Sequence, residues 1–275
     1  MNSVLKTLLI LIAVLLALNA CLPAIENQLV FWPLYDESET PADYGLEFEV
    51  LELASEDGTR LHAWAIPYKE DAPWLIYFHG NTSNMTKNLP TPLLIRERAG
   101  MNLLMAGYRG YYQSEGKPGE AGLYQDAQAY YNYLLSQDIT PDEIVLWGFS
   151  LGSGVAAELA SKQEVAALIL QAPYTSVPDA ARWRYNTALP DSLFQNHFRT
   201  KDKIADINAS LLIVHGENDD TIPFEHSLSL IELASEPKRL ISFQGNHDSL
   251  KRRAEEDLSF VMDGIISFLQ GVLSQ

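Results

Sequence analysis

The sequence predicts an α/β fold in which a mostly parallel central sheet, opened by an antiparallel hairpin, carries helices on both faces. Short continuous apolar runs, which are typical of buried parallel strands, alternate along the chain with helix-length segments. The strand-like runs are Trp74 to Phe78, Leu103 to Ala106, Ile144 to Trp147, Ala166 to Leu170, Leu211 to Val214 and Leu240 to Phe243. The helix-like segments are Thr86 to Arg98, Glu120 to Gln137, Leu151 to Ser161, Phe224 to Leu233 and Leu258 to Leu269.

A hairpin precedes this alternation. Leu46 to Leu53 and Arg60 to Ile66 each alternate apolar and polar residues, and Glu56-Asp57-Gly58 lies between them. Period-two alternation on both sides of a turn that contains glycine predicts two antiparallel strands. We therefore expect the sheet to begin antiparallel.

The alternation lapses between Pro173 and Asn208. Apolar and aromatic residues are scattered there among polar ones, namely Trp183, Tyr185, Leu189, Phe194 and Phe198. Two interpretations stay open for this segment. It either walls an acyl pocket or packs over the sheet as ordinary helix.

Gly148-Phe149-Ser150-Leu151-Gly152 is the most informative motif, a G-x-S-x-G between a strand-like run and a helix-like segment. In this context it predicts a nucleophile elbow, because two glycines let the backbone turn tightly and hold the serine hydroxyl at the helix N-terminus. Leu151, Val155 and Leu159 recur every fourth residue, as one face of a helix requires. The alternative is a glycine-rich turn without chemistry.

A serine nucleophile requires a histidine base. The hydroxyl is unreactive near neutral pH unless a histidine accepts its proton and a carboxylate orients that histidine. Around an elbow the chain order is serine, acid, histidine. His247 is the predicted base, because Gly245-Asn246-His247-Asp248 follows a strand end, where ligand chemistry lies in open α/β sheets. His215 is expected to be a strand-end hydrogen bonder, and His226 a helix surface residue.

The acid is expected in the loop after Leu211 to Val214. Asp219 and Asp220 stand side by side there. Asp219 is the better candidate, but residue types alone do not choose between two neighbours in one loop.

Stabilising a tetrahedral oxyanion requires two backbone N–H donors. Asn81 follows the strand-like run Trp74 to Phe78 directly after His79 and Gly80, and Leu151 follows the serine. We expect these two residues to supply the oxyanion hole. His79 is expected to brace the loop rather than to move a proton.

The composition limits the cofactors and partners. At 275 residues and 47% hydrophobic, the chain can form one domain with a full core. The formal net charge of −17 and the lack of basic clusters argue against nucleic acid and against electrostatic docking to anionic lipid. The sequence has no histidine-pair zinc signature and no G-x-G-x-x-G after the elbow, so we expect no metal and no organic cofactor.

The N-terminus differs from the rest of the chain. Lys6 is its only charge before Glu26, and an unbroken apolar run extends from Leu8 to Leu18. That run is shorter than a membrane span of about 20 residues and is typical of a signal peptide. We expect a cleaved signal, with an uncleaved membrane anchor as the alternative. The expected organisation is a signal peptide at 1–20, a lipidated N-terminus and tether at 21–43, and the folded domain at 44–275.

Cys21, the only cysteine, lies at the expected cleavage site. Leu18-Asn19-Ala20-Cys21 resembles the lipobox of bacterial lipoproteins, whose cysteine becomes the lipidated first residue, although Asn19 departs from the small or aliphatic residue usual there. The presence of Leu22 rather than Asp after the cysteine implies, by the same resemblance, the outer membrane facing the periplasm. The alternative for Cys21 is a buried free thiol.

Several motifs occur in order along the chain: Tyr77-Phe78-His79-Gly80-Asn81, Tyr108-Arg109-Gly110-Tyr111, Ser114-Glu115-Gly116-Lys117-Pro118, Gly148 to Gly152, His215-Gly216 to Pro223, and Gly245-Asn246-His247. Over about Val30 to Leu269 the chain resembles α/β-hydrolase-domain serine hydrolases of the membrane-associated subgroup that includes lysophospholipases and protein depalmitoylases. The resemblance implies an α/β-hydrolase fold without a large lid. It also implies Ser150 as nucleophile, His247 as base and Asn81 as an oxyanion donor. In the family's loop H-G-x-x-D-x-x-V-P the acid aligns with Asp219, which decides against Asp220.

These features together predict a serine hydrolase that cleaves an acyl ester or thioester through an acyl-enzyme. The expected substrate is a small acyl ester or a lipid-like molecule, and we expect a monomer that is held at the membrane by its N-terminal lipid. A peptidase on the same scaffold is one alternative. A non-catalytic lipoprotein that binds envelope partners is the other.

Overall fold

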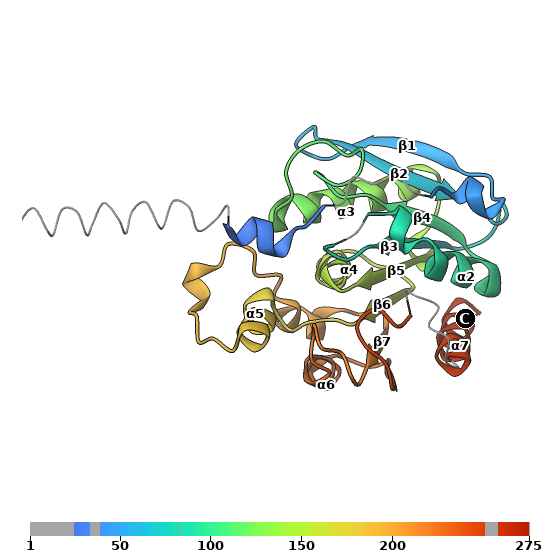
Figure 1. The fold of residues 1–275 in the computed structure, drawn as a ribbon. Helices are drawn as coiled ribbons and strands as arrows, with labels where there is room; N and C mark the ends of the chain where they lie inside the picture. Colours follow the sequence, from blue (N-terminus) through green and yellow to red (C-terminus); the bar gives the residue numbers. More distant parts are fainter. Residues whose placement is uncertain (1–24, 34–38, 83, 251–257, 275) are drawn as a thin grey trace, which may run out of the picture.

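The computed structural model describes residues 25–33, 39–82, 84–250 and 258–274, and an eight-stranded sheet forms the centre of this part of the chain (Figure 1). The strand order is β1-β2-β4-β3-β5-β6-β7-β8. β2 runs antiparallel to β1 and β4, and the other neighbouring pairs are parallel. The strands are β1 (Glu49–Ala54), β2 (Arg60–Ile66), β3 (Trp74–Phe78), β4 (Asn102–Ala106), β5 (Ile144–Phe149), β6 (Ala167–Gln171), β7 (Ser210–Gly216) and β8 (Lys238–Phe243). The predicted fold class, including the antiparallel opening, is confirmed.

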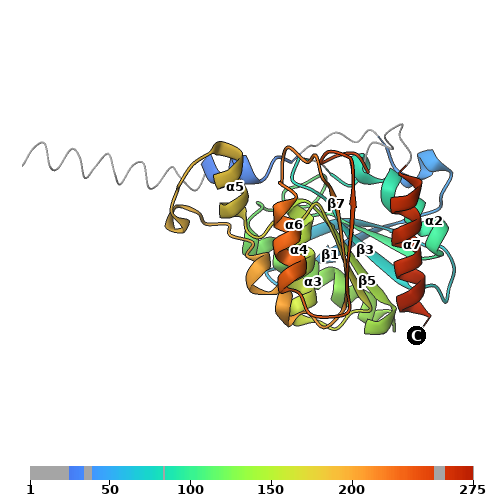
Figure 2. The same cartoon turned by 90° about the horizontal axis from the view of Figure 1, so that it is seen from below.

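Helices cover both faces of the sheet (Figures 1 and 2). They are α2 (Pro90–Ala99), α3 (Glu120–Ser136), α4 (Leu151–Lys162), α5 (Val177–Tyr185), α6 (Glu225–Leu233) and α7 (Ser259–Leu273). Buried side chains of α3, α4 and α6 form one apolar core with the sheet, and those of α2 and α7 form a second core on the opposite face. α5 lies apart from both layers, next to the loops that follow β5 and β7.

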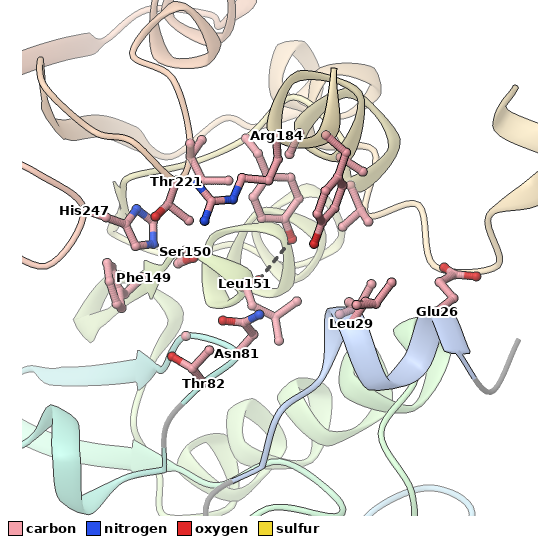
Figure 3. Close-up of a pocket in the computed structure, with 18 of the residues that line it drawn as sticks. Glu26, Leu29, Asn81, Thr82, Phe149, Ser150, Leu151, Arg184, Thr221 and His247 are labelled. Carbon is pink, nitrogen blue, oxygen red and sulfur yellow. Dashed lines mark hydrogen bonds between the residues drawn. The ribbon is translucent and has the colours of Figure 1, made fainter. Parts of the chain in front are cut away.

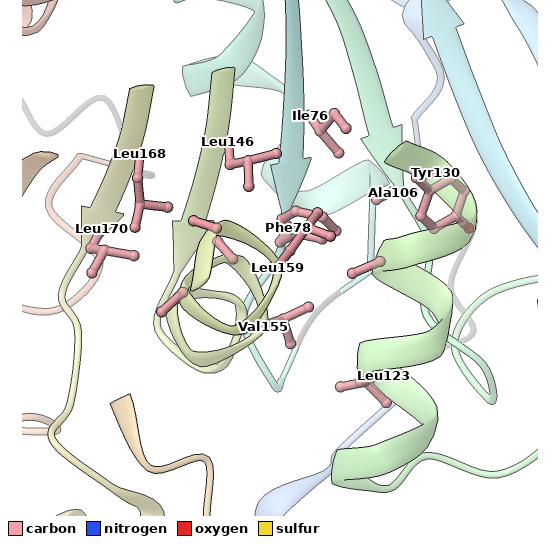
Figure 4. Close-up of a cluster of buried hydrophobic side chains, with 14 of the residues drawn as sticks. Ile76, Phe78, Ala106, Leu123, Tyr130, Leu146, Val155, Leu159, Leu168 and Leu170 are labelled. Carbon is pink, nitrogen blue, oxygen red and sulfur yellow. The ribbon is translucent and has the colours of Figure 1, made fainter. Parts of the chain in front are cut away.

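The core beneath α4 explains why this helix sits centrally on the sheet. Leu146, Leu168 and Leu170 project from β5 and β6 toward Val155 and Leu159 of α4 (Figure 4). All five side chains are buried. Full burial of one such side chain stabilises the fold by about 1.5–3 kcal/mol. This packing fixes the position of the helix whose first turn follows Ser150.

Two helix predictions need correction. The segment expected as one helix from Thr86 to Arg98 divides into a 3-10 turn, Thr86–Asn88, and α2, which begins at Pro90. Proline lacks an N–H and clashes with the preceding turn, so it is tolerated at a helix start but not inside. α5 was not predicted, although Ser176 caps it by accepting a hydrogen bond from the Asp179 N–H at 3.1 Å.

The segment at 25–33 packs onto the domain. Residues 25–30 are helical, and the Glu26 carboxylate accepts hydrogen bonds from the Gln195 and Asn196 N–H groups, both at 2.8 Å. Phe31 is buried, and its ring meets that of Phe198 edge to face. This part of the expected tether is therefore attached to the loop that follows α5.

The expected signal peptide at 1–20 and the lipidation residue Cys21 lie outside the described residues. Within the ranges that are described, no helix combines the length and apolar character needed to cross a membrane.

The turn from β5 into α4 depends on two glycines. A Cβ atom at Gly148 would lie 2.2 Å from the Gly152 carbonyl oxygen, and one at Gly152 would lie 2.1 Å from the Phe78 carbonyl oxygen. Real Cβ atoms essentially never approach backbone so closely. The end of β3 and the first turn of α4 can therefore touch only without a side chain at Gly152, and the end of β5 can touch the same turn only without one at Gly148.

We predict that Gly152→Ala destabilises the fold, whereas Gly271→Ala does not. Overpacking costs about 1–3 kcal/mol, and more where the neighbour is backbone. Gly271 lies near the end of α7, and a Cβ atom added there would have no neighbour within 4 Å, so alanine gains up to about 1 kcal/mol of helix propensity. Urea unfolding measures the free energy of unfolding of both variants. Equal changes in the two would contradict the conclusion that the β3–α4 contact requires glycine at 152.

Candidate active site

Ser150 has a strained backbone between β5 and α4. Its φ is 51° and its ψ is −117°, a region that residues with a side chain rarely occupy. The Ser150 N–H donates to the Gln171 carbonyl at 2.9 Å, and the Ser150 carbonyl accepts from the N–H and hydroxyl of Ser153 at 2.8 and 2.6 Å. Strain of this kind costs about 1–3 kcal/mol and persists because the surroundings enforce it. The predicted elbow geometry is present.

His247 lies within hydrogen-bonding distance of Ser150. Its Nε2 is 3.0 Å from the Ser150 Oγ, and its Nδ1 is 2.6 Å from Oδ2 of Asp219. A carboxylate only accepts hydrogen bonds, so Nδ1 carries the proton and a neutral ring leaves Nε2 free to accept from the serine hydroxyl. The structure thus brings together the three residues that the sequence singled out for catalysis.

Asp219 is the carboxylate that faces this histidine. Its side chain is fully buried, and its Oδ1 accepts hydrogen bonds from the Thr221 and Ile222 N–H groups, both at 2.8 Å. Burial raises the pKa of this carboxyl, but the hydrogen bonds from His215 and His247 outweigh burial and hold the pKa well below its usual range. Asp219 is therefore ionised at neutral pH.

The neighbouring Asp220 points elsewhere. It is exposed, and its backbone carbonyl accepts a hydrogen bond from Arg184 at 2.9 Å. Of the two adjacent carboxylates in this loop, Asp219 is the one that contacts His247.

His215 contacts Asp219, a partner that the sequence did not reveal. Its Nε2 lies 3.1 Å from Oδ2 of Asp219 and 3.0 Å from the Ile222 carbonyl oxygen, so this nitrogen carries a proton. Its Nδ1 lies 2.6 Å from the Ser227 hydroxyl on α6. The expected strand-end hydrogen bonder therefore fixes the loop that carries Asp219.

The prediction for His226 was wrong. It is buried rather than on a helix surface, and its Nδ1 accepts from the N–H of Thr175 at 3.2 Å and lies 2.8 Å from that residue's hydroxyl. Burial lowers the pKa of this ring. The amphipathic pattern of α6 could not show that the chain just before α5 covers this position.

The loop expected to supply the oxyanion hole is braced by two tyrosines of the Tyr108-Arg109-Gly110-Tyr111 motif. The Tyr108 hydroxyl donates to the His79 carbonyl and that of Tyr111 to the Asn81 carbonyl, both at 3.0 Å. His79 Nδ1 lies 2.8 Å from the Gly80 carbonyl oxygen, a contact that fits the bracing role expected for it. The sequence pointed to this motif only through the family resemblance and indicated no role for its two tyrosines.

Asn81 and Leu151 line the same cavity as Ser150 and His247 (Figure 3). Leu151 is the first residue of α4, so its N–H has no acceptor within the helix. The two residues expected to form the oxyanion hole thus lie in one pocket with the candidate nucleophile.

The cavity has a volume of about 500 Å³ and reaches from Ser150 to α5. Its side walls are mainly apolar, and they come from α5, from the loop after it and from the N-terminal segment: Leu29, Val30, Val177, Ala180, Ala181, Tyr185, Leu189 and Phe194. The pocket-wall interpretation thus holds for Tyr185, Leu189 and Phe194. Trp183 and Phe198 do not line it, and Phe198 is core. Sequence reasoning missed the contribution of Leu29 and Val30.

Within the described ranges, no three or more His, Cys, Asp or Glu side chains are grouped so that they could hold a metal ion.

Known proteins resemble this chain in both sequence and structure. A model of the α/β-hydrolase fold family matches residues 73–200. The uncharacterized protein YfhR of Escherichia coli K12 is 31% identical over 79% of this chain and 81% of its own length. The α/β-hydrolase domain-containing protein WAV2 of Arabidopsis thaliana is 32% identical over 78% of each chain. Among solved structures, the Pyrococcus furiosus esterase Pf2001 superposes with a TM-score of 0.73 at 22% identity, over 89% of this chain and 98% of its own.

We predict that Asp219→Asn reduces kcat/KM for an ester substrate by about 10⁴-fold, because an amide cannot hold the histidine in the required tautomer. Asp220→Asn is the matched control and should stay near wild type. Steady-state kinetics measure both variants. Equal losses in the two, or a loss confined to Asp220→Asn, would contradict the assignment.

The lowered pKa of Asp219 also predicts how stability depends on pH. The pKa of Asp219 in the folded state lies below the unfolded value of about 3.9, so the ionised carboxylate stabilises the fold above about pH 4. This contribution is lost as the pH falls from about 4 toward the pKa of the folded state. The difference in unfolding free energy between wild type and Asp219→Asn should shrink between about pH 5 and pH 2. Chemical unfolding across this range measures it, and a constant difference would refute the linkage.

Proposed function

The chain belongs to the α/β-hydrolase family, and from that premise we propose that it is a serine hydrolase that cleaves carboxylic esters or thioesters through an acyl-enzyme. One observation carries the proposal. Ser150, His247 and Asp219 form a continuous series of hydrogen-bonding contacts at one end of a largely apolar cavity.

The proposed reaction begins when the Ser150 Oγ attacks the substrate's carbonyl carbon. His247 Nε2 takes the hydroxyl proton, and the ionised Asp219 stabilises the imidazolium that forms. The N–H groups of Asn81 and Leu151 stabilise the negative charge on the carbonyl oxygen.

The second half of the reaction releases the acyl group. The imidazolium gives its proton to the departing alcohol or thiol, which leaves an acyl ester on Ser150. A water molecule then attacks this ester and gives a proton to His247. His247 passes the proton to the Ser150 Oγ as the bond between Oγ and the acyl carbon breaks, which releases the carboxylic acid and regenerates the free serine.

The cavity supports an acyl group as the part of the substrate that is bound. Its side walls are mostly aliphatic and aromatic, and a pocket of about 500 Å³ falls within the usual range for small-molecule sites. An acyl chain placed against α5 would bring its carbonyl to Ser150. This fits the lipid-like substrates of the lysophospholipase and depalmitoylase subgroup that the chain resembles.

We further propose that the protein acts at a membrane as a lipoprotein. The lipobox-like sequence that ends at Cys21 supports lipid attachment, and Leu22 supports an outer-membrane location facing the periplasm. The domain is then held at the bilayer through the short segment that precedes Ile25.

We predict that Ser150→Ala lowers kcat for p-nitrophenyl butyrate by roughly 10⁴- to 10⁶-fold, because the nucleophile is lost while binding remains. Ser161→Ala, at the C-terminal end of the same helix and away from the elbow, should leave the rate unchanged. Release of p-nitrophenol measures both. Wild-type turnover that survives in Ser150→Ala would end the serine-hydrolase proposal.

We predict that Ala181→Trp shortens the preferred acyl chain. Ala181 lines the cavity on α5, and an indole there fills space that a long chain would occupy. The rate of hydrolysis is measured for p-nitrophenyl esters from acetate to palmitate. Long-chain esters should be hydrolysed at least about tenfold more slowly than by wild type, because apolar contact with several methylenes is lost, whereas the rate for acetate should not change. An unchanged profile would place the acyl chain elsewhere.

A further inference from the structure

Exposed apolar side chains are concentrated in two segments of the chain that also supply residues to the wall of the cavity. Half of the exposed large apolar residues of the described chain fall within 25–32 and 183–193. We call this set the apolar rim: Ile25, Leu29, Trp32, Trp183, Tyr185, Leu189 and Leu193, each 40% to 60% exposed. Single exposed apolar residues are common, but a concentration of them in two segments that border a cavity indicates an interaction surface.

The two segments of the rim lie side by side. Both views show the N-terminal helical turn next to α5 and the loop after it (Figures 1 and 2). The Glu26 carboxylate joins them through the Gln195 and Asn196 N–H groups. Leu29, Tyr185 and Leu189 also line the cavity, so the rim is continuous with the acyl-binding wall.

The length of the chain limits how far the rim can lie from a membrane. Cys21 precedes Ile25 by four residues, and four extended residues span at most about 14 Å. Leu18, which ends the apolar run, precedes Ile25 by seven residues, or at most about 25 Å. Whichever of the two attachments operates, the anchor must lie closer to the rim than the thickness of a bilayer's hydrocarbon core, about 30 Å.

The charge around the rim suits contact with lipid. Residues 25–33 and 177–199 contain three acidic and three basic residues, whereas the whole chain carries a formal net charge of −17. These two segments therefore lack the acidic excess of the whole chain, which would repel an anionic surface. Tryptophan and tyrosine, which make up three of the seven rim residues, favour the interface between headgroups and acyl chains.

We propose that the apolar rim docks onto the surface of the bilayer to which the chain is attached, so that the cavity opens toward the acyl chains. An acylated lipid then reaches Ser150 from the membrane without crossing water. The identity of the substrate rests on the proposed hydrolase activity, whereas the docking rests only on the proposed attachment to a membrane. Docking is apolar, so it requires no anionic lipid.

Tryptophan quenching tests the docking directly. The full chain is reconstituted into phosphatidylcholine vesicles with or without brominated acyl chains, since bromine quenches only tryptophans that reach the acyl region. We expect quenching in wild type that is largely lost in the Trp32→Phe, Trp183→Phe double variant, because phenylalanine preserves docking and removes the fluorophores. Trp74→Phe, at the start of β3, is the matched control and should retain the quenching. Absence of quenching in membrane-attached wild type, or full quenching in the double variant, would overturn the proposal.

Hydrolysis tests the consequence for the substrate. The Trp183→Ser, Leu193→Ser variant changes rim residues that do not line the cavity, and Leu228→Ser on α6 is the control at a similarly exposed leucine. We expect the rim variant to hydrolyse a long-chain ester held in vesicles at least about tenfold more slowly, with p-nitrophenyl acetate turnover unchanged, since membrane binding scales with buried apolar area. Equal rates on the vesicle substrate would overturn the route from the membrane. Quenching as expected without hydrolysis of any ester by wild type would refute the proposed function and leave the docking supported.

Discussion

The close contact between the end of β3 and the first turn of α4 is the constraint on which the site depends. Gly152 allows it, and Gly148 allows the matching contact between the end of β5 and the same turn. Ser150 is left at a positive φ with its hydroxyl directed toward His247. Packing of Val155 and Leu159 beneath the helix supplies the stabilisation that offsets this local strain. Because β3 also ends at the loop that carries Asn81, the same contact sets the nucleophile beside one of the expected oxyanion donors.

A second constraint acts on the acid. A buried carboxylate is costly unless it is paired and hydrogen-bonded. Asp219 meets this condition with two backbone N–H groups on one oxygen and two histidines on the other. His215 is thus part of what keeps the carboxylate ionised, and its bond to Ser227 ties the acid loop to α6. The orientation of His247 depends on a network that extends well beyond the three residues in contact.

The sequence was a good guide where a feature depends on local pattern. β3 has the predicted bounds, because a continuous apolar run between polar turns leaves little choice of ends. Ser150 and His247 could also be chosen in advance, since strand ends in a parallel sheet converge at one edge, whereas the choice of Asp219 over Asp220 needed the family resemblance. Features that depend on long-range contact could not be predicted. The burial of His226 against Thr175 and the folding of Glu26 onto the loop after α5 involve residues distant in sequence. The contact of His215 with Asp219, four residues further on, depends instead on how their loop turns. α5 had a local signal in the cap at Ser176, but its nine residues include an aspartate and two arginines, so the segment lacks the apolar character of the helices that were predicted.

The central claim is that Ser150 is a nucleophile activated by His247. Site-resolved mass spectrometry after treatment with a fluorophosphonate tests it most directly, because this probe forms a stable bond only with an activated serine. We expect one adduct on the peptide that carries Ser150 and a severe loss of labelling rate in His247→Ala. An adduct on a different serine, or labelling that proceeds unchanged without His247, would contradict it.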